Sequence, residues 1–224
     1  MIPDFLSHLG AQNGYPIPYT TYVNEGVADF AVNDDYKVNA CVLGGLCAIC
    51  GKVLSFDNVW FVGGVRSALD PRGMYNDPPV HRDCGAYALA TCPYLATPSY
   101  IGVKQREKRI QALSDNNPDM LGTIDYTMDP NKPPTFFMIQ VNGFQVIQRP
   151  GHLAVRMLPS KKFINAIEFK DGNIVSHKQL GEYRKRGLDM LRKDGLTVSK
   201  LPKMLKDAWY GGLTNRWPFF INKH

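Results

Sequence analysis

Three cysteines and one histidine stand in two pairs with a spacing that zinc sites use. The pairs are Cys47-Ala-Ile-Cys50 and His81-Arg-Asp-Cys84, each with two residues between its members. A knuckle or a first helical turn brings two such side chains to one side, where both can bind one ion. Four protein ligands complete a tetrahedral shell and leave no open position for a substrate. The spacing therefore predicts a structural Zn²⁺ held by Cys47, Cys50, His81 and Cys84.

The two other cysteines fit this site less well. Cys92 follows Cys84 on the same expected helix, and at ~1.5 Å per residue their Cα atoms would be ~12 Å apart. We therefore interpret Cys41 and Cys92 as small core residues, and Cys92 stays the alternative fourth ligand if His81 points away. Five cysteines are an odd number, and four of them fall within residues 47–92. This favours metal-bound thiolates in a reducing compartment, the cytoplasm of a bacterial or phage-infected cell, over a disulfide framework.

The segments around the two pairs predict the elements that position them. Gly51 can supply the positive φ that a tight knuckle needs. Val53-Leu54 and Val59–Val62 are expected to form a two-stranded hairpin around a turn at residues 55–58. Arg82 to Thr91 is expected to be a helix that Pro93 ends. A knuckle, a hairpin and a ligand-bearing helix make a treble-clef-like module, which we place at residues 35–95.

The N-terminal third predicts an extended arm over residues 1–34 that packs on the core, with a strand at Val27–Val32. A helix over residues 35–44 should follow, capped by Asp34 or Asp35 and ended by Gly44-Gly45. Residues 96–134 are expected to be a long, partly irregular connector.

The C-terminal region, residues 135–224, predicts a small antiparallel sheet of hairpins with basic helices. Asn142-Gly143 suits a type I′ turn and predicts that 135–141 pairs with 144–149. Further strands are expected at 153–158, 163–169 and, after a tight Asp171-Gly172 turn, at 174–175. Ser176 should cap a helix that runs to about residue 193, and a shorter helix is expected near 199–209. The expected fold class is α+β.

Positive charge is concentrated in the last third of the chain. The net charge is +6 overall, and from residue 160 onward 14 Lys/Arg stand against 6 Asp/Glu. Such a surface suits polyanions. The candidate phosphate contacts are Lys178, Arg184, Lys185, Arg186, Arg192, Lys193, Lys200, Lys203 and Lys206. Nearby aromatic residues either stack on bases or anchor these helices to the core.

The leading hypothesis is thus a zinc-stabilised, non-enzymatic protein that binds nucleic acid. The alternative is a protein-interaction module, such as a phage factor that docks on a host or virion protein. No stretch approaches ~18 uninterrupted apolar residues, and the N-terminus lacks a basic leader, so neither a membrane span nor a secretory signal is expected. The sequence does not predict the oligomeric state.

A metal-dependent nuclease is the weaker alternative, since treble-clef folds also host such enzymes. That chemistry needs a histidine base on the hairpin and a metal with an open coordination position. Residues 53–62 contain no histidine, and His152 and His177 have no acidic or nucleophilic motif beside them. Walker, G-x-G-x-x-G, G-x-S-x-G and H-E-x-x-H motifs are also absent from the sequence.

Several stretches resemble a family of uncharacterised proteins of actinobacteria and their phages. They are Ala28-Asp-Phe30, Leu46–Leu54, Trp60–Gly64, Pro78–Leu95 and Glu168–Val175, of which the central block is the specific part. The resemblance implies a zinc module fused to a small α+β region and implies no activity. The Lys- and Asn-rich C-terminal third departs from the actinobacterial members, which favours a phage or another host.

Overall fold

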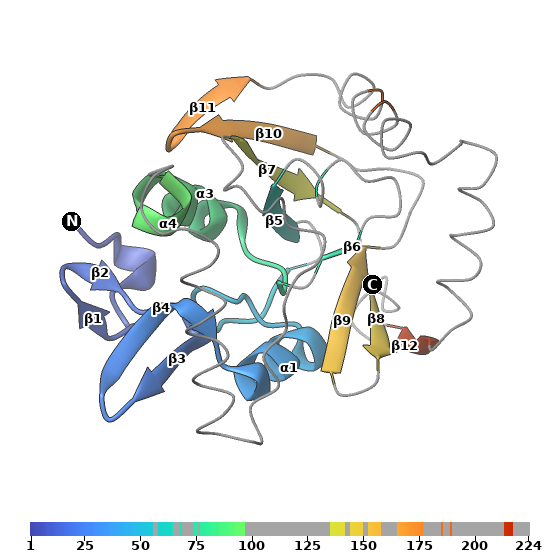
Figure 1. The fold of residues 1–224 in the computed structure, drawn as a ribbon, viewed down its shortest axis with the longest axis horizontal. Helices are drawn as coiled ribbons and strands as arrows, with labels where there is room; N and C mark the ends of the chain where they lie inside the picture. The colour runs from blue at the N-terminus through green and yellow to red at the C-terminus, as the bar shows by residue number, and fades with distance from the viewer. Residues whose placement is uncertain are drawn as a thin grey trace.

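The fold was obtained as a computed structural model of the 224-residue chain. It describes residues 1–55, 58–64, 68, 74, 75, 77–96, 135–141, 144–149, 152–157, 165–176, 185, 189 and 213–216. Helices and small antiparallel sheets are mixed in it, which confirms the α+β class (Figure 1). Within these residues no helix is long and apolar enough to cross a membrane.

The expected arm folds into one short 3-10 helix and two hairpins. The helix is η1 (Asp4–Leu6), and the paired strands are β1 (Ala11–Gln12) with β2 (Tyr15–Pro16), and β3 (Thr21–Asn24) with β4 (Val27–Asn33). The side-chain amide of Gln12 joins the two hairpins, because it both donates to and accepts from the backbone of Ala28, at 2.8 and 2.7 Å. The strand expected at Val27–Val32 is confirmed as β4.

The first long helix, α1 (Asp35–Gly44), has the expected limits. The Asp34 carboxylate accepts hydrogen bonds from the N–H groups of Tyr36 and Lys37 and so caps its start. Gly45 ends it with a φ of 70°, in the left-handed region that glycine adopts without strain.

One four-stranded sheet, which we call the central sheet, has the order β11-β10-β7-β5. Its strands are β5 (Trp60–Gly64), β7 (Thr135–Gln140), β10 (Asn165–Lys170) and β11 (Asn173–Ser176), all antiparallel. Asp171 and Gly172 have φ values of 50° and 78°, which confirms the tight turn expected between β10 and β11.

A second sheet has the order β12-β8-β9-β6. Its strands are β6 (Met74–Tyr75), β8 (Phe144–Arg149), β9 (His152–Met157) and β12 (Leu213–Arg216). Figure 1 shows β8, β9 and β12 on the opposite side of the molecule from the N-terminal hairpins.

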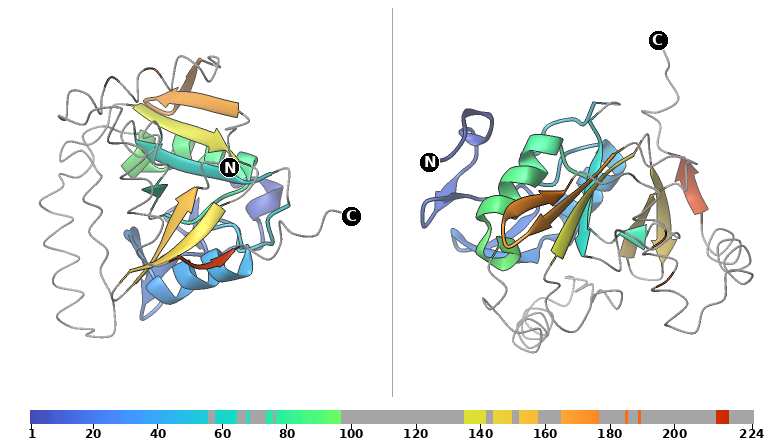
Figure 2. Two further views of the ribbon diagram at one scale, coloured as in Figure 1. Left: turned by 90° about the vertical axis from the view of Figure 1, so that its right-hand side faces the viewer. Right: turned by 90° about the horizontal axis from the view of Figure 1, so that it is seen from above.

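The core lies on both faces of the central sheet, as the alternation of side chains along β5 requires. On one face the ring of Phe61 packs on Tyr75 and Phe144 of the second sheet, with centroids 4.9 and 5.6 Å away. On the other face, the side chains of Val62 and Met138 lie against Gly85 of α3 (Arg82–Thr91). Figure 2 shows α3, with α4 (Pro93–Ala96) after it, along this side of the sheet. The sheet is therefore covered by α3 on one side and by the second sheet's aromatic residues on the other.

Two other predicted hairpins, at Asn142-Gly143 and between Val53-Leu54 and Val59–Val62, are wrong. β7 pairs with β5 and β10, whereas β8 pairs with β9 and β12, so the strands on either side of Asn142-Gly143 belong to different sheets. Each strand already has two neighbours, which leaves no edge for the expected pairing. Similarly, β5 pairs with β7 and bridges Val80, while Val53 bridges Leu46, so Val53-Leu54 and β5 form no hairpin.

The central sheet also crosses the expected division of the chain, because β5 comes from the zinc module and β7 and β10 come from the C-terminal region. Most of the connector 96–134 lies outside the described residues, with only Ala96 described at the end of α4. The expected helices at 177–193 and 199–209 lie there too, apart from Lys185 and Asp189, which are helical.

Candidate metal centre

The first ligand pair sits on a closed loop, which we call the knuckle (residues 47–52). The N–H of Cys47 donates to Lys52 O at 2.8 Å, and the N–H of Gly51 donates to Cys47 O at 2.9 Å. Gly51 has a φ of 70°, and an ideal Cβ placed on it would lie 2.8 Å from a ring carbon of Tyr19. Glycine is thus required twice here, by the backbone conformation and by the aromatic ring against it.

The second pair stands at the start of α3. His81 is the N-cap residue and Cys84 lies in the first helical turn, which confirms the expected helix and places both candidate ligands at its start. The chain enters the helix along β5, because Trp60 and Val80 exchange two backbone hydrogen bonds at 2.9 and 2.8 Å. Pro79 O accepts from the N–H of Ala48 at 3.0 Å and so ties this segment to the knuckle.

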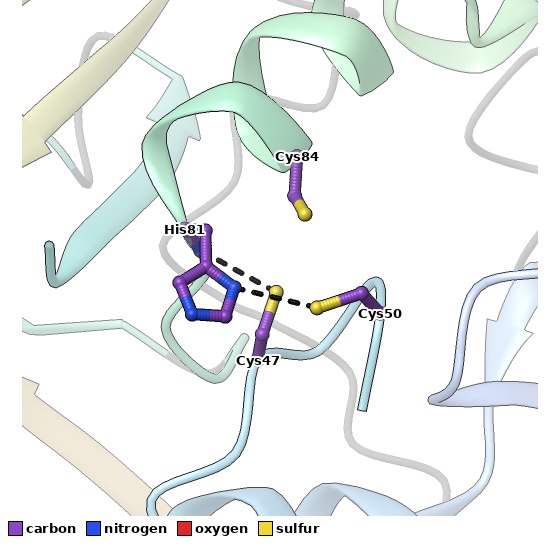
Figure 3. Close-up of side chains that lie close together, drawn as sticks. All are labelled: Cys47, Cys50, His81 and Cys84. Carbon is purple, nitrogen blue, oxygen red and sulfur yellow. Dashed lines mark hydrogen bonds between the residues drawn. The ribbon is translucent and has the colours of Figure 1, made fainter. Parts of the chain in front are cut away.

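Figure 3 shows the four side chains converging from these two elements. Their ligand atoms all lie within 4.8 Å of one another, and Cys50 Sγ lies 3.3 Å from His81 Nδ1. Zinc at ~2.3 Å from sulfur and ~2.0 Å from nitrogen sets neighbouring donors roughly 3.5–3.8 Å apart, so only small movements are needed. The three thiols are buried and the imidazole is half-buried. The set therefore fits a tetrahedral ion of the Cys₃His type.

The imidazole of His81 is oriented by a second contact. Its Nε2–H donates to the carbonyl oxygen of Val53 at 3.1 Å, which leaves Nδ1 facing the thiols, where the neutral imidazole would bind a metal. A histidine that binds a metal through one ring nitrogen usually donates its other N–H in this way. The orientation supports His81 as the fourth ligand.

The thiols and the imidazole shift one another's pKa values through their hydrogen bonds. Hydrogen bonds from Cys47 and then Cys84 lower the pKa of Cys50, whereas hydrogen bonds with Cys47 and Cys50 raise the pKa of Cys84. The pKa of His81 rises to about 10, chiefly through hydrogen bonds with Cys47 and then Cys50. A divalent cation bound here would displace the protons of the cluster, because it binds thiolates and a neutral imidazole.

The two other cysteines stay outside this cluster. Cys92 is half-buried at the C-cap of α3, at the opposite end of the helix from His81. Cys41 is fully buried in α1, and burial, followed by the charges of Cys47 and Cys50, raises its pKa to about 12. Cys41 is thus a neutral core thiol, as expected.

Of the nine candidate phosphate contacts, Lys185 alone falls within the described residues, where it is helical and its side chain is exposed. The others lie outside them: Lys178, Arg184, Arg186, Arg192, Lys193, Lys200, Lys203 and Lys206. The basic surface therefore stays a prediction.

Three residues beside the site were not singled out from the sequence. Asn58, assigned only to a turn, accepts a hydrogen bond from the N–H of Arg82 at 2.8 Å. Gly85 lets α3 approach the central sheet, and His8 contacts the knuckle carbonyl of Cys50 at 2.9 Å. Of these three roles, only that of Asn58 had a signal in the sequence, because asparagine is a preferred helix-capping residue.

Comparison of the chain with protein-family models, curated proteins and solved structures gave no match. The resemblance to actinobacterial and phage proteins therefore stays a prediction, and the zinc-type cluster is the part of it that the geometry supports.

Proposed function

We propose that Cys47, Cys50, His81 and Cys84 hold a structural zinc ion and that the chain is a zinc-stabilised binding protein. One observation carries this proposal: four donors from two separate elements come within 4.8 Å of one another. Four protein ligands saturate zinc, so the ion would join the knuckle to α3 and would not activate water. The knuckle and α3 then correspond to a treble-clef-like module in which β7 pairs with β5 in place of the expected hairpin.

The zinc content of the natively purified protein tests this directly. We expect one zinc per chain by elemental analysis, and loss of the metal with a lower melting temperature in Cys47→Ser and Cys84→Ser. Cys92→Ser is the matched control and should keep one zinc, which also tests Cys92 as the alternative ligand. A folded, equally stable protein without zinc would disprove the proposal.

We further propose nucleic acid as the ligand class, bound through the basic residues between 178 and 206. The charge of that segment and the exposure of Lys185 support this proposal. Phosphate contacts release counterions, so binding should weaken steeply as salt rises. A protein partner, the alternative, would not give this dependence.

Fluorescence anisotropy with labelled DNA and RNA over a salt series distinguishes the two. The triple variant Arg184→Glu, Lys185→Glu and Arg186→Glu should weaken binding and lower the salt slope by about one for each phosphate that is no longer neutralised. Lys170→Glu, at an exposed position at the end of β10, is the matched control. A co-purifying protein and no anisotropy change would favour the interaction module.

A further inference from the structure

Residues 3–20, which we call the N-terminal strap, cover the knuckle from outside. The strap donates hydrogen bonds to three consecutive carbonyl groups of the knuckle, those of residues 48, 49 and 50. Ala48 O accepts from the N–H of Thr20 at 3.1 Å, and Ile49 O accepts from the N–H of Tyr19 at 2.9 Å. Cys50 O accepts from His8 Nε2 at 2.9 Å. The strap thus binds the backbone of the metal-binding loop carbonyl by carbonyl.

Apolar contacts follow the same path. Leu6 is fully buried and belongs to the same core cluster as Cys47, Cys50 and Cys84. The ring of Tyr19 lies so close to Gly51 that a Cβ there would be 2.8 Å from it. These contacts depend on the closed form of the knuckle, since the three carbonyls keep these directions only while the loop stays closed.

Among residues 1–10, His8 is the residue whose side chain forms a hydrogen bond with the knuckle. Ser7, its neighbour, bonds within the strap, where its hydroxyl donates to Asp4 O at 2.7 Å. Farther along, the β1–β2 hairpin is held by Gln12 on Ala28, away from the knuckle. Along the first ten residues, therefore, His8 supplies the hydrogen bond to the knuckle, and Leu6 belongs to the core cluster that contains Cys47 and Cys50.

We propose that strap docking and metal binding are coupled, with His8 as the positioning residue that joins them. This inference rests on the proposed zinc site. A closed, metal-bound knuckle presents the three carbonyls, and the docked strap in turn holds the knuckle closed and slows release of the ion. Coupling of this kind is reciprocal, so whatever the metal adds to strap docking, the strap adds to metal binding.

The rate of zinc transfer to a colorimetric chelator tests one direction, on the full-length zinc-loaded protein. His8→Ala removes the donor to Cys50 O and should release zinc about two- to tenfold faster, the range set by one hydrogen bond. His8→Gln keeps a side-chain N–H donor and should restore a rate near that of the wild type. Ser7→Ala is the matched control, because it loosens the same element without touching the knuckle.

Hydrogen exchange tests the other direction. Chelation of the metal should raise exchange at the strap amides of Leu6, Leu9, Tyr19 and Thr20, while the amides of β7 stay protected. Equal zinc release by His8→Ala and Ser7→Ala would overturn the proposal, as would strap exchange that does not change on chelation. Simultaneous loss of protection in the strap and β7 would also overturn it, because the strap would then follow global unfolding.

The zinc content of the wild-type sample separates this proposal from the one on which it rests. If the wild type binds one zinc and the His8→Ala variant releases its zinc no faster than the wild type, only the coupling fails. If the wild type binds no zinc, the proposed function fails and the coupling fails with it.

Discussion

The side-chain oxygen of Asn58 accepts a hydrogen bond from the backbone N–H of Arg82 at 2.8 Å, across 24 positions of the chain. Arg82 is the first residue of α3, and His81, the N-cap residue, makes no capping bond with its side chain. Helix starts carry N–H groups without intrahelical partners, and a capping side chain normally satisfies one of them. Asn58 does this from the loop before β5, so it fixes the helix that carries His81 and Cys84.

Replacing Asn58 with alanine should lower the free energy of unfolding by about 1 kcal/mol, the usual cost of a lost helix cap. Zinc should also be released faster, because the start of α3 becomes less fixed. Denaturant unfolding and chelator transfer measure the two effects. Asn58→Asp keeps an acceptor oxygen near the positive end of the helix and should retain most of the stability. Equal stability of the alanine and aspartate variants would contradict the capping role.

Gly51→Ala should destabilise the knuckle more than a positive φ alone explains. An alanine at a φ of 70° costs roughly 1–2 kcal/mol, and its Cβ would also meet the Tyr19 ring at 2.8 Å. Gly14→Ala is the matched control, since Gly14 has a φ of 81° and nothing within 4 Å of such a Cβ. Thermal unfolding of the two variants separates backbone strain from the clash. Equal losses of stability in both would show that Tyr19 yields without cost.

Gly85→Ala should destabilise the protein even though alanine is the better helix former by about 1 kcal/mol. The added Cβ would lie 2.8 Å from Met138 Cε and 2.9 Å from Val80 Cγ2. The methionine end can move, but the branched valine cannot, and overpacking of a core costs about 1–3 kcal/mol. A double-mutant cycle with Val80→Ala measures this clash. The stability losses of Gly85→Ala and Val80→Ala should sum to more than the loss measured for the double variant. A sum equal to the loss of the double variant would exclude the contact.

Cys41 should resist alkylation in the native protein. Burial raises its pKa to about 12, so at pH 8 only roughly one thiol in ten thousand is the reactive thiolate. Peptide mapping after iodoacetamide should show Cys92, which is half-buried, labelled well before Cys41. A chelator should make the knuckle thiols reactive as well, because thiolates released from a metal are nucleophilic. Labelling of Cys41 as fast as Cys92 would contradict its burial.

The same pKa shift sets a direction for stability against pH. The folded state keeps Cys41 as the neutral thiol. The contribution of this thiol to stability is therefore fully present below pH 9.0, the pKa of a cysteine in the unfolded chain. Above that pH the unfolded chain ionises more easily than the folded one, and the free energy of unfolding should fall as pH rises toward 12. Cys41→Ala should flatten this part of the profile.

The candidate ligands and the local elements of the site could be predicted from the sequence, because both depend on residues close together in the chain. Ligand spacing indicated the Cys₃His set, Asp34 and Gly45 indicated the limits of α1, and Pro93 indicated where α3 ends. Each of these signals acts within a few residues, so no knowledge of distant contacts was needed to interpret it.

The strand pairings were beyond such signals. Asn142-Gly143 favours a hairpin locally, yet β7 finds its partners in β5 and β10, which lie far from it in sequence. Burial on both faces of a central strand outweighs the preference of one turn. The roles of Asn58 and Gly85 escaped for the same reason, since each depends on a residue from another element.

The position of β5 in the central sheet has a consequence for how the chain folds while it is being synthesised. All four candidate metal ligands leave the ribosome before residue 135, where β7 begins, so the strand that pairs with β5 in the sheet appears long after it. Pairing over such separations is slow, because a long loop must close first. A metal bound to the nascent chain would therefore hold the two ends of residues 47–84 together. The strands made later would then find β5 already in position as an edge on which to assemble.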